Sequence, residues 1–161
     1  MRDVDLGSAT FANSCPGYDD SRSATLLGGE ASLPAGAGAT HEVSLGAVGY
    51  GDVDGDGADD AVLLLRCHFV GAGVDSSGEL RAYRARPDGG IEQIGAGHLF
   101  EHPREPQAAT AEALRITVDL DVYADTDPLC CPSSGAREVW RFDGSGFVRE
   151  SSTPIAPPGA G

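Results

Sequence analysis

The sequence predicts an all-β fold, an antiparallel sandwich or irregular barrel with long Gly/Pro-rich loops and little helix. The 23 glycines and 10 prolines make up 33 of the 161 residues, which favours short elements joined by turns over long helices. Runs of alternating or continuous apolar residues lie between the Gly/Pro-rich stretches, as strands require. We expect a single domain over residues 1–150 and a flexible tail or linker stub over residues 151–161.

The strand candidates in the first half of the chain differ in their expected burial. Residues 43–48 alternate imperfectly between apolar and polar side chains, which is typical of a half-buried strand. Residues 61–65 are continuously apolar, which predicts a central strand covered on both faces. Residues 79–85 and 91–94 are the next strand candidates, and the turn residues at 87–90 separate them.

The second half contains the one helical candidate and the clearest strand. Residues 107–114 carry four alanines and predict at most a short helix. Residues 114–123 alternate without a break, which predicts a strand with one buried and one exposed face. Residues 138–142 and 147–149 are the last strands, and the Asp-Gly-Ser-Gly segment between them predicts a hairpin turn. No long repeat is visible, so a complete β-propeller is excluded.

The charge balance excludes several partners and chemistries. Acidic residues outnumber basic ones 25 to 11, which gives a formal net charge of −14. Phosphate backbones and anionic membrane surfaces repel such a chain, so we expect no nucleic-acid partner. All eleven basic residues are arginine. The absence of lysine excludes a Walker-A loop, a protein-kinase core and a pyridoxal Schiff base. The longest apolar run is far too short for a transmembrane segment.

The four cysteines, Cys15, Cys67, Cys130 and Cys131, predict two structural disulfides made in an oxidising compartment. Neighbours on an extended strand point to opposite faces, so we favour Cys15 and Cys67 each bridging to one member of the adjacent pair. A Cys130–Cys131 bond in a proline-flanked turn is the alternative pairing, and a reduced cytosolic protein with buried thiols is the alternative state. The first residues lack the apolar stretch of a signal peptide. We therefore expect a mature extracellular or cell-envelope domain, with the signal peptide absent from this chain.

Residues 52–60, Asp-Val-Asp-Gly-Asp-Gly-Ala-Asp-Asp, carry the clearest chemical signal in the chain. Aspartates at the first, third and fifth loop positions, a glycine at the sixth and an aspartate at the ninth are typical of calcium loops. Gly57 is expected to supply the positive φ with which the chain turns back. The predicted Ca²⁺ ligands are the carboxylates of Asp52, Asp54, Asp56 and Asp60 and the carbonyl of Ala58.

This loop is expected to join two strands rather than two helices. Leu63 stands where an EF-hand has its closing glutamate, and an apolar strand follows instead of an amphipathic helix. Five aspartates within nine residues would repel one another strongly without a cation. The alternative is an Asp/Gly-rich surface turn that needs no metal.

The segment 51–62 is similar to the calcium loop of FG-GAP repeats, which are found in integrin-type propellers. Together with a strand that ends at Cys67, the Cys-Cys-Pro-Ser at 130–133 and the aromatic strand 140–147, it also resembles a group of small secreted or lipid-anchored actinobacterial proteins of uncharacterised function. The resemblance implies envelope localisation, no known activity, and calcium binding by Asp52, Asp54, Asp56 and Asp60. The Phe-Gly and Gly-Ala-Pro signatures of the repeat are absent, so the resemblance does not imply a propeller.

A second acidic stretch holds Asp119, Asp121, Asp125 and Asp127. The first two are expected on the exposed face of their strand and the other two in the following turn. They could complete a second cation site or attract a basic partner, but we favour a solvated face. His98 and His102 have the spacing of a zinc pair on a helix, but neighbouring glycines and a proline favour two incidental loop histidines.

These observations predict a secreted, calcium-stabilised β domain that acts as a binding or structural module of the cell envelope. Its expected partner is a protein or glycan of the envelope, and we expect a monomer with no catalytic residue assigned. The alternative from another class is a small extracellular hydrolase, or a hydrolase inhibitor, that uses the calcium loop as scaffold. A hydrolase should have a deep pocket with convergent titratable groups away from the loop, whereas a module should have a shallow surface.

Overall fold

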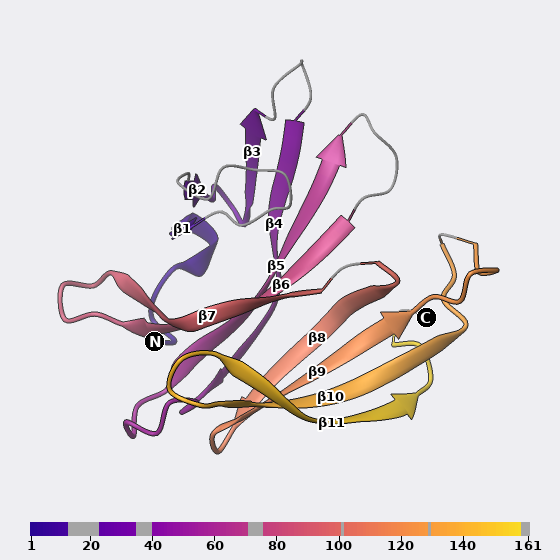
Figure 1. The fold of residues 1–161 in the computed structure, drawn as a ribbon. Coiled ribbons are helices and arrows are strands. Elements are labelled where there is room, and N and C mark those ends of the chain that lie inside the picture. Colours follow the sequence, from indigo (N-terminus) through magenta and orange to yellow (C-terminus); the bar gives the residue numbers. More distant parts are fainter. Residues whose placement is uncertain (13–22, 35–39, 71–75, 101, 129, 159–161) are drawn as a thin grey trace.

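Figure 1 shows the computed structural model, which describes residues 1–12, 23–34, 40–70, 76–100, 102–128 and 130–158. Within these ranges the chain forms strands and one 3₁₀ turn, η1 (Leu6–Ser8), and no α-helix. Every strand pairing is antiparallel, and neither large sheet closes into a barrel. The prediction of an all-β fold is confirmed, and the two large sheets are arranged as a β sandwich.

The strands form a short ribbon and two larger sheets. The ribbon pairs β1 (Thr10–Ala12) with β2 (Ser23–Thr25). The five-stranded sheet has the strand order β3 (Glu30–Pro34), β4 (Thr40–Gly51), β5 (Asp60–Val70), β6 (Ser76–Ala85), β7 (Ile91–Phe100). The four-stranded sheet has the order β11 (Phe147–Ile155), β10 (Ser134–Phe142), β9 (Arg115–Val122), β8 (Arg104–Glu112).

Strand β5 lies between two hydrophobic layers, which explains its continuous apolar sequence. Val62 and Leu64 pack between the two large sheets, against Ile116 of β9 and its buried neighbours. Leu63 and Leu65 point to the other face, where the N-terminal segment with Phe11 covers the sheet. Figure 1 shows β1 and β2 on the side of the five-stranded sheet away from β8–β11. The predicted central strand is confirmed, because residues 61–65 are all buried.

The two sheets approach most closely where β4 lies against β8. A Cβ at Gly51 would stand 2.6 Å from the carbonyl oxygen of Ala111, and one at Gly49 would stand 3.0 Å from that of Ala109. Real Cβ atoms essentially never come closer than 3.0 Å to a backbone atom, so position 51 requires glycine, and a side chain at position 49 would fit only if β8 shifted. Gly51 is the last residue of β4, and its contact with β8 therefore fixes the start of the acidic loop against the second sheet.

The short helix predicted at residues 107–114 is wrong, because this segment belongs to β8 and the turn after it. Residues 104–112 pair with β9, and Ala109 is buried in the core between the sheets. Small side chains suit this position because β4 lies directly against it. Tertiary pairing outweighs the weak helical preference of four alanines.

The predicted boundary at residue 151 is also wrong. Residues 151–155 are the second half of β11 and pair with β10. After the strand, the Ala156 carbonyl oxygen and the Pro158 ring lie within about 3 Å of where a Cβ at Gly135 would be. The chain therefore stays attached to the four-stranded sheet beyond the expected tail start, because backbone pairing needs no apolar side chains.

Candidate metal centre

The acidic loop joins β4 to β5, as the sequence predicts. Gly51 and Asp60 form the last cross-strand pair, and residues 52–59 make the connection. Gly57 has φ of 87°, as expected, and Gly55 also has a positive φ, of 85°. L-residues with a side chain rarely adopt a positive φ. The two glycines do so here and turn the chain sharply enough for its carboxylates to face one centre.

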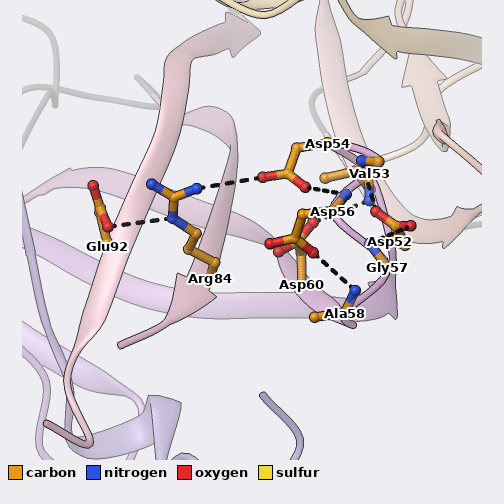
Figure 2. Close-up of polar contacts among 10 residues, drawn as sticks. Asp52, Val53, Asp54, Asp56, Gly57, Ala58, Asp60, Arg84 and Glu92 are labelled. Carbon is orange, nitrogen blue, oxygen red and sulfur yellow. Dashed lines mark hydrogen bonds and ion pairs between the residues drawn. The ribbon is translucent and has the colours of Figure 1, made fainter. Parts of the chain in front are cut away.

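Three carboxylates converge in this loop. One oxygen each from Asp52, Asp54 and Asp60 lies within 4.8 Å of the other two, which is close enough for one ion to contact all three. Figure 2 shows these side chains, with Asp54 pointing across to Arg84. Asp56 and the carbonyl of Ala58 lie outside this three-residue group, and their assignment as ligands stays a prediction.

The same carboxylates also hold the loop backbone in place. Asp52 accepts hydrogen bonds from the backbone N–H of Gly55 at 2.7 Å and of Gly57 at 3.1 Å. The Asp54 carboxylate accepts from the Asp56 N–H at 3.1 Å, and the Asp56 carboxylate accepts from the Ala58 N–H at 2.8 Å. The loop is therefore ordered by its own side chains, with the carboxylates positioned before any ion binds.

Asp60 is the unusual member of the group because it is only 1% exposed. Its Oδ2 accepts a hydrogen bond from the Val53 N–H at 3.0 Å, but its Oδ1 has no hydrogen-bond partner. Burial raises the pKa of this carboxyl, and the charges of Asp54 and Asp56 raise it further. A buried carboxylate oxygen without a donor costs free energy that a bound cation would recover.

Two neighbours connect the loop to the rest of the fold. Val53 lies between two candidate ligand residues, yet its side chain is buried in the hydrophobic core between the sheets. The backbone N–H of Leu114, in the turn between β8 and β9, donates to the Asp52 carbonyl at 3.0 Å. Order in the acidic loop is thus coupled to the packing of both sheets.

Arg84 places a protein cation near the candidate ligands. Arg84 Nη1 is 3.7 Å from an Asp54 oxygen, and the same guanidinium donates to Glu92 at 3.2 Å. Arg84 is partly exposed and shared with Glu92, so it offsets only part of the charge of the acidic loop. Asp59 points elsewhere and pairs with Arg2 at 2.9 Å.

The cysteine pairing that we favour is wrong, and the alternative is found. Cys130 and Cys131 form a disulfide with each other. They lie in the turn between β9 and β10 rather than on an extended strand, so the rule of opposite faces does not apply. Cys67 is disulfide-bonded, and Cys15 falls outside the described residues.

The second acidic stretch does not gather into a group like that of the loop; among described residues, only Asp52, Asp54 and Asp60 do so. Asp119 forms a bidentate pair with Arg137, with both contacts at 2.7 Å. Asp121 is 3% exposed, so its expected place on an exposed face is wrong. It lies opposite Gly135, beside the C-terminal residues that cover this part of the sheet.

Sequence reasoning misses a second cluster of polar residues, around Glu138. Glu138 is completely buried and bonds to Arg104 and Arg149, which come from β8 and β11. His98, expected in a loop, lies on β7 and stacks on Trp140. The only sequence signal was a glutamate at an inward position of a strand that also carries tryptophan, and the pairing partners are more than ten residues away.

Comparison with known proteins adds no relative: no family model, curated protein or solved structure matches this chain. Within the described ranges, no helix is long and apolar enough to cross a membrane.

Proposed function

We propose that this protein is an extracellular, calcium-stabilised β domain that acts as a binding or structural module of the cell envelope. The observation that carries the metal part is the buried Oδ1 of Asp60, which has no donor and belongs to a group with Asp52 and Asp54. A divalent cation supplies what this oxygen lacks and offsets the repulsion within the loop.

The chemistry of the ligand set favours calcium over other common ions. All three converging groups are carboxylates, and hard oxygen ligands suit Ca²⁺ and Mg²⁺ better than zinc or copper. Ca²⁺ accepts irregular shells of roughly six to eight oxygens, whereas Mg²⁺ demands a near-ideal octahedron. A loop of consecutive turns, with a backbone carbonyl and water to complete the shell, matches the calcium requirement.

The ion's role in this proposal is structural. Val53 and the Leu114 N–H connect the loop to the core and to the second sheet, so an ordered loop favours the packed sandwich. With calcium at about 100 times its dissociation constant, the expected stabilisation is about 2.7 kcal/mol. That is a considerable share of the stability of a small domain.

A binding role is favoured over hydrolysis by the contents of the pocket around Glu138. This pocket lies away from the calcium loop, as a hydrolase site would. Its lining contains one carboxylate, and that carboxylate is held by two arginines. Glycoside hydrolysis by the common mechanism needs two carboxylates on opposite sides of the bond. The pocket is thus better suited to holding a ligand than to cleaving one.

The test of the metal site compares two neighbouring aspartates. Asp60→Asn removes the buried charge but keeps an oxygen that can accept from the Val53 N–H. Since burial raises the pKa of Asp60, its ionised form destabilises the metal-free fold, so the variant should melt no lower than the wild type in chelator. It should gain nothing from calcium. Asp59→Asn, the same change on an exposed side chain paired with Arg2, should keep the full calcium response.

Thermal melts in calcium, magnesium and chelator, with calorimetric titration of the metal, measure these responses. We expect one calcium per chain, a clear rise in melting temperature with calcium and little with magnesium. Equal melting of the wild-type protein in calcium and chelator, with no heat of binding, would reduce the loop to an acidic turn.

A further inference from the structure

A cavity of about 280 Å³ lies where the two sheets meet at their open side. Strand β7, at the edge of the five-stranded sheet, contributes His98, Leu99 and Phe100. The opposite wall comes from the four-stranded sheet, with Glu138 and Trp140 on β10. At the other side of the sandwich, the glycines of β4 let the two sheets touch.

The charges in this cavity do not cancel. Arg104 and Arg149 both donate to the same atom, Oε1 of Glu138, and Arg149 does so at 2.6 Å. Two guanidinium groups thus face one carboxylate. Burial lowers the pKa of His98, so this imidazole adds no positive charge at neutral pH. The result is a local excess of one positive charge in a chain whose formal net charge is −14.

The two guanidinium groups retain donors for a ligand. Each carries five N–H groups, and within the described residues each makes one hydrogen bond, to Glu138. Their side chains are 35% and 49% exposed, for Arg104 and Arg149 respectively, so they lie at the mouth of the cavity. Glu138 offsets only one of the two positive charges, so a second anion at the exposed side of the guanidinium groups would offset the other.

Two of the residues that line the cavity also have a buried polar atom without a partner. Glu138 Oε2 has no donor, and the indole Nε1 of Trp140 has no acceptor. Native proteins contain few such atoms, and each one needs an explanation. A ligand with both hydroxyl donors and acceptors could bond to both, provided that the exposed arginine side chains shift outward to admit it.

The remaining lining residues are mostly aromatic, and they pack on one another. The Trp140 ring lies 4.3 Å from the His98 ring and 5.9 Å from the Phe100 ring, measured between centroids. Arg149 lies over the same indole, 5.9 Å from its centroid. The cavity volume is at the small end for ligand pockets, which limits the occupant to about one ring.

We infer that this cavity binds a small hydroxylated carboxylate with a ring body, of the chemical class of a uronic acid. The carboxylate binds between Arg104 and Arg149, hydroxyl groups meet the unpartnered atoms of Glu138 and Trp140, and the ring packs on the aromatic wall. This inference deepens the proposed binding role and rests on it. Inorganic phosphate would meet the charge but not the aromatic wall, and a neutral sugar would meet the wall but not the charge.

Trp140 provides the readout, because it is the only tryptophan in the chain. The calcium-loaded protein is titrated with glucuronate, glucose and inorganic phosphate, with tryptophan fluorescence and calorimetry recorded in parallel. Glucuronate should give a saturable signal, and glucose and phosphate should bind about tenfold more weakly or worse, since each lacks one set of contacts.

Variants distinguish binding of glucuronate in the cavity from a general effect of surface charge. Arg149→Gln should weaken glucuronate binding about tenfold or more, and Arg104→Gln should do the same. Each variant leaves the other arginine paired with Glu138, so the buried charge keeps a partner. Arg137→Gln is the matched control, because Arg137 is an exposed arginine paired with Asp119 outside the cavity, and it should bind like the wild type.

The outcomes distinguish this inference from the metal proposal. A protein that melts higher with calcium but gives no saturable signal with glucuronate overturns the ligand inference alone. Equal affinity for glucose and glucuronate, or for phosphate and glucuronate, overturns it as well. Unchanged glucuronate binding in both cavity variants, with the fold intact by circular dichroism, places the anion elsewhere and also overturns it.

Discussion

Residues 52–60 contain five aspartates and residues 119–127 contain four, in stretches of equal length, yet the two differ in structure. In the first stretch, positive-φ glycines turn the backbone, and carboxylates from three positions gather within 4.8 Å of one another. In the second, the chain is a strand followed by a turn, and no such group forms among the described residues.

The second stretch satisfies its carboxylates one at a time. Asp119 is paired with Arg137, and Asp127 accepts hydrogen bonds from the backbone N–H groups of Ala124 and Ser133, both at 2.8 Å. In the acidic loop, by contrast, the buried Oδ1 of Asp60 has no partner. The comparison teaches that the number of acidic residues does not by itself make a candidate cation site, which also needs carboxylates that converge and a buried oxygen without a partner.

Among the variants that test this comparison, truncation of Val53 should have the largest effect on the free energy of unfolding. Val53→Ala removes a side chain that is 1% exposed in the core between the sheets, so the free energy of unfolding should fall by roughly 2 kcal/mol. Because Val53 lies between Asp52 and Asp54, calcium affinity should fall too. Thr126→Ala, an exposed substitution in the second stretch, should change neither quantity. Denaturant unfolding and calorimetry measure both, and an unchanged calcium affinity in Val53→Ala would separate the loop from the core.

Removal of the partner of Asp119 should have a smaller effect. Arg137→Gln breaks an exposed bidentate pair, and exposed ion pairs contribute little to stability because water and salt screen them. The variant should melt only slightly below the wild type and should still bind one calcium, since an unpaired Asp119 on an extended strand does not converge with its neighbours. A second calcium site in the calorimetric titration would contradict the view that an extended backbone keeps these carboxylates apart.

The smallest expected effect is the acid dependence of the Asp127 turn. The Ala124 N–H, followed by the groups of Ser133, lowers the pKa of this carboxyl in the folded protein. A lowered folded-state pKa means that the ionised group stabilises the fold above about pH 4, and that this contribution is lost as the pH falls through the lowered value.

Asp127→Asn should therefore lose less stability than the wild type between about pH 5 and pH 3, as measured by melts across that range. Asp125→Asn is the control, with the same charge change on an exposed side chain two residues earlier. If the melting temperature fell equally with pH for the wild type and Asp127→Asn, the turn would not depend on the charge of Asp127.

Local sequence patterns predicted most strands and the position of the acidic loop. The continuous run 61–65 predicted burial on both faces, and the segment 143–146 forms the expected hairpin turn, with the Asp143 N–H donating to the Gly146 carbonyl. The wrong predictions concern segments whose structure depends on more than their own sequence pattern. Residues 107–112 form a strand because β9 and β4 are available to pair and pack with them. Cys130 joins Cys131 because their segment is a turn rather than a strand.

The sequence by itself determined the fold class, the strand–loop–strand context of the aspartates and the turning glycines, because these depend on periodicity, backbone freedom and spacing over a few residues. Tertiary structure decided which carboxylates became buried and which found partners. Glu138 meets arginines 34 and 11 residues away, and Asp60 is buried at the start of β5, which the second sheet covers on one face and the N-terminal segment on the other. Burial and pairing depend on contacts between distant segments, and local pattern does not encode those contacts.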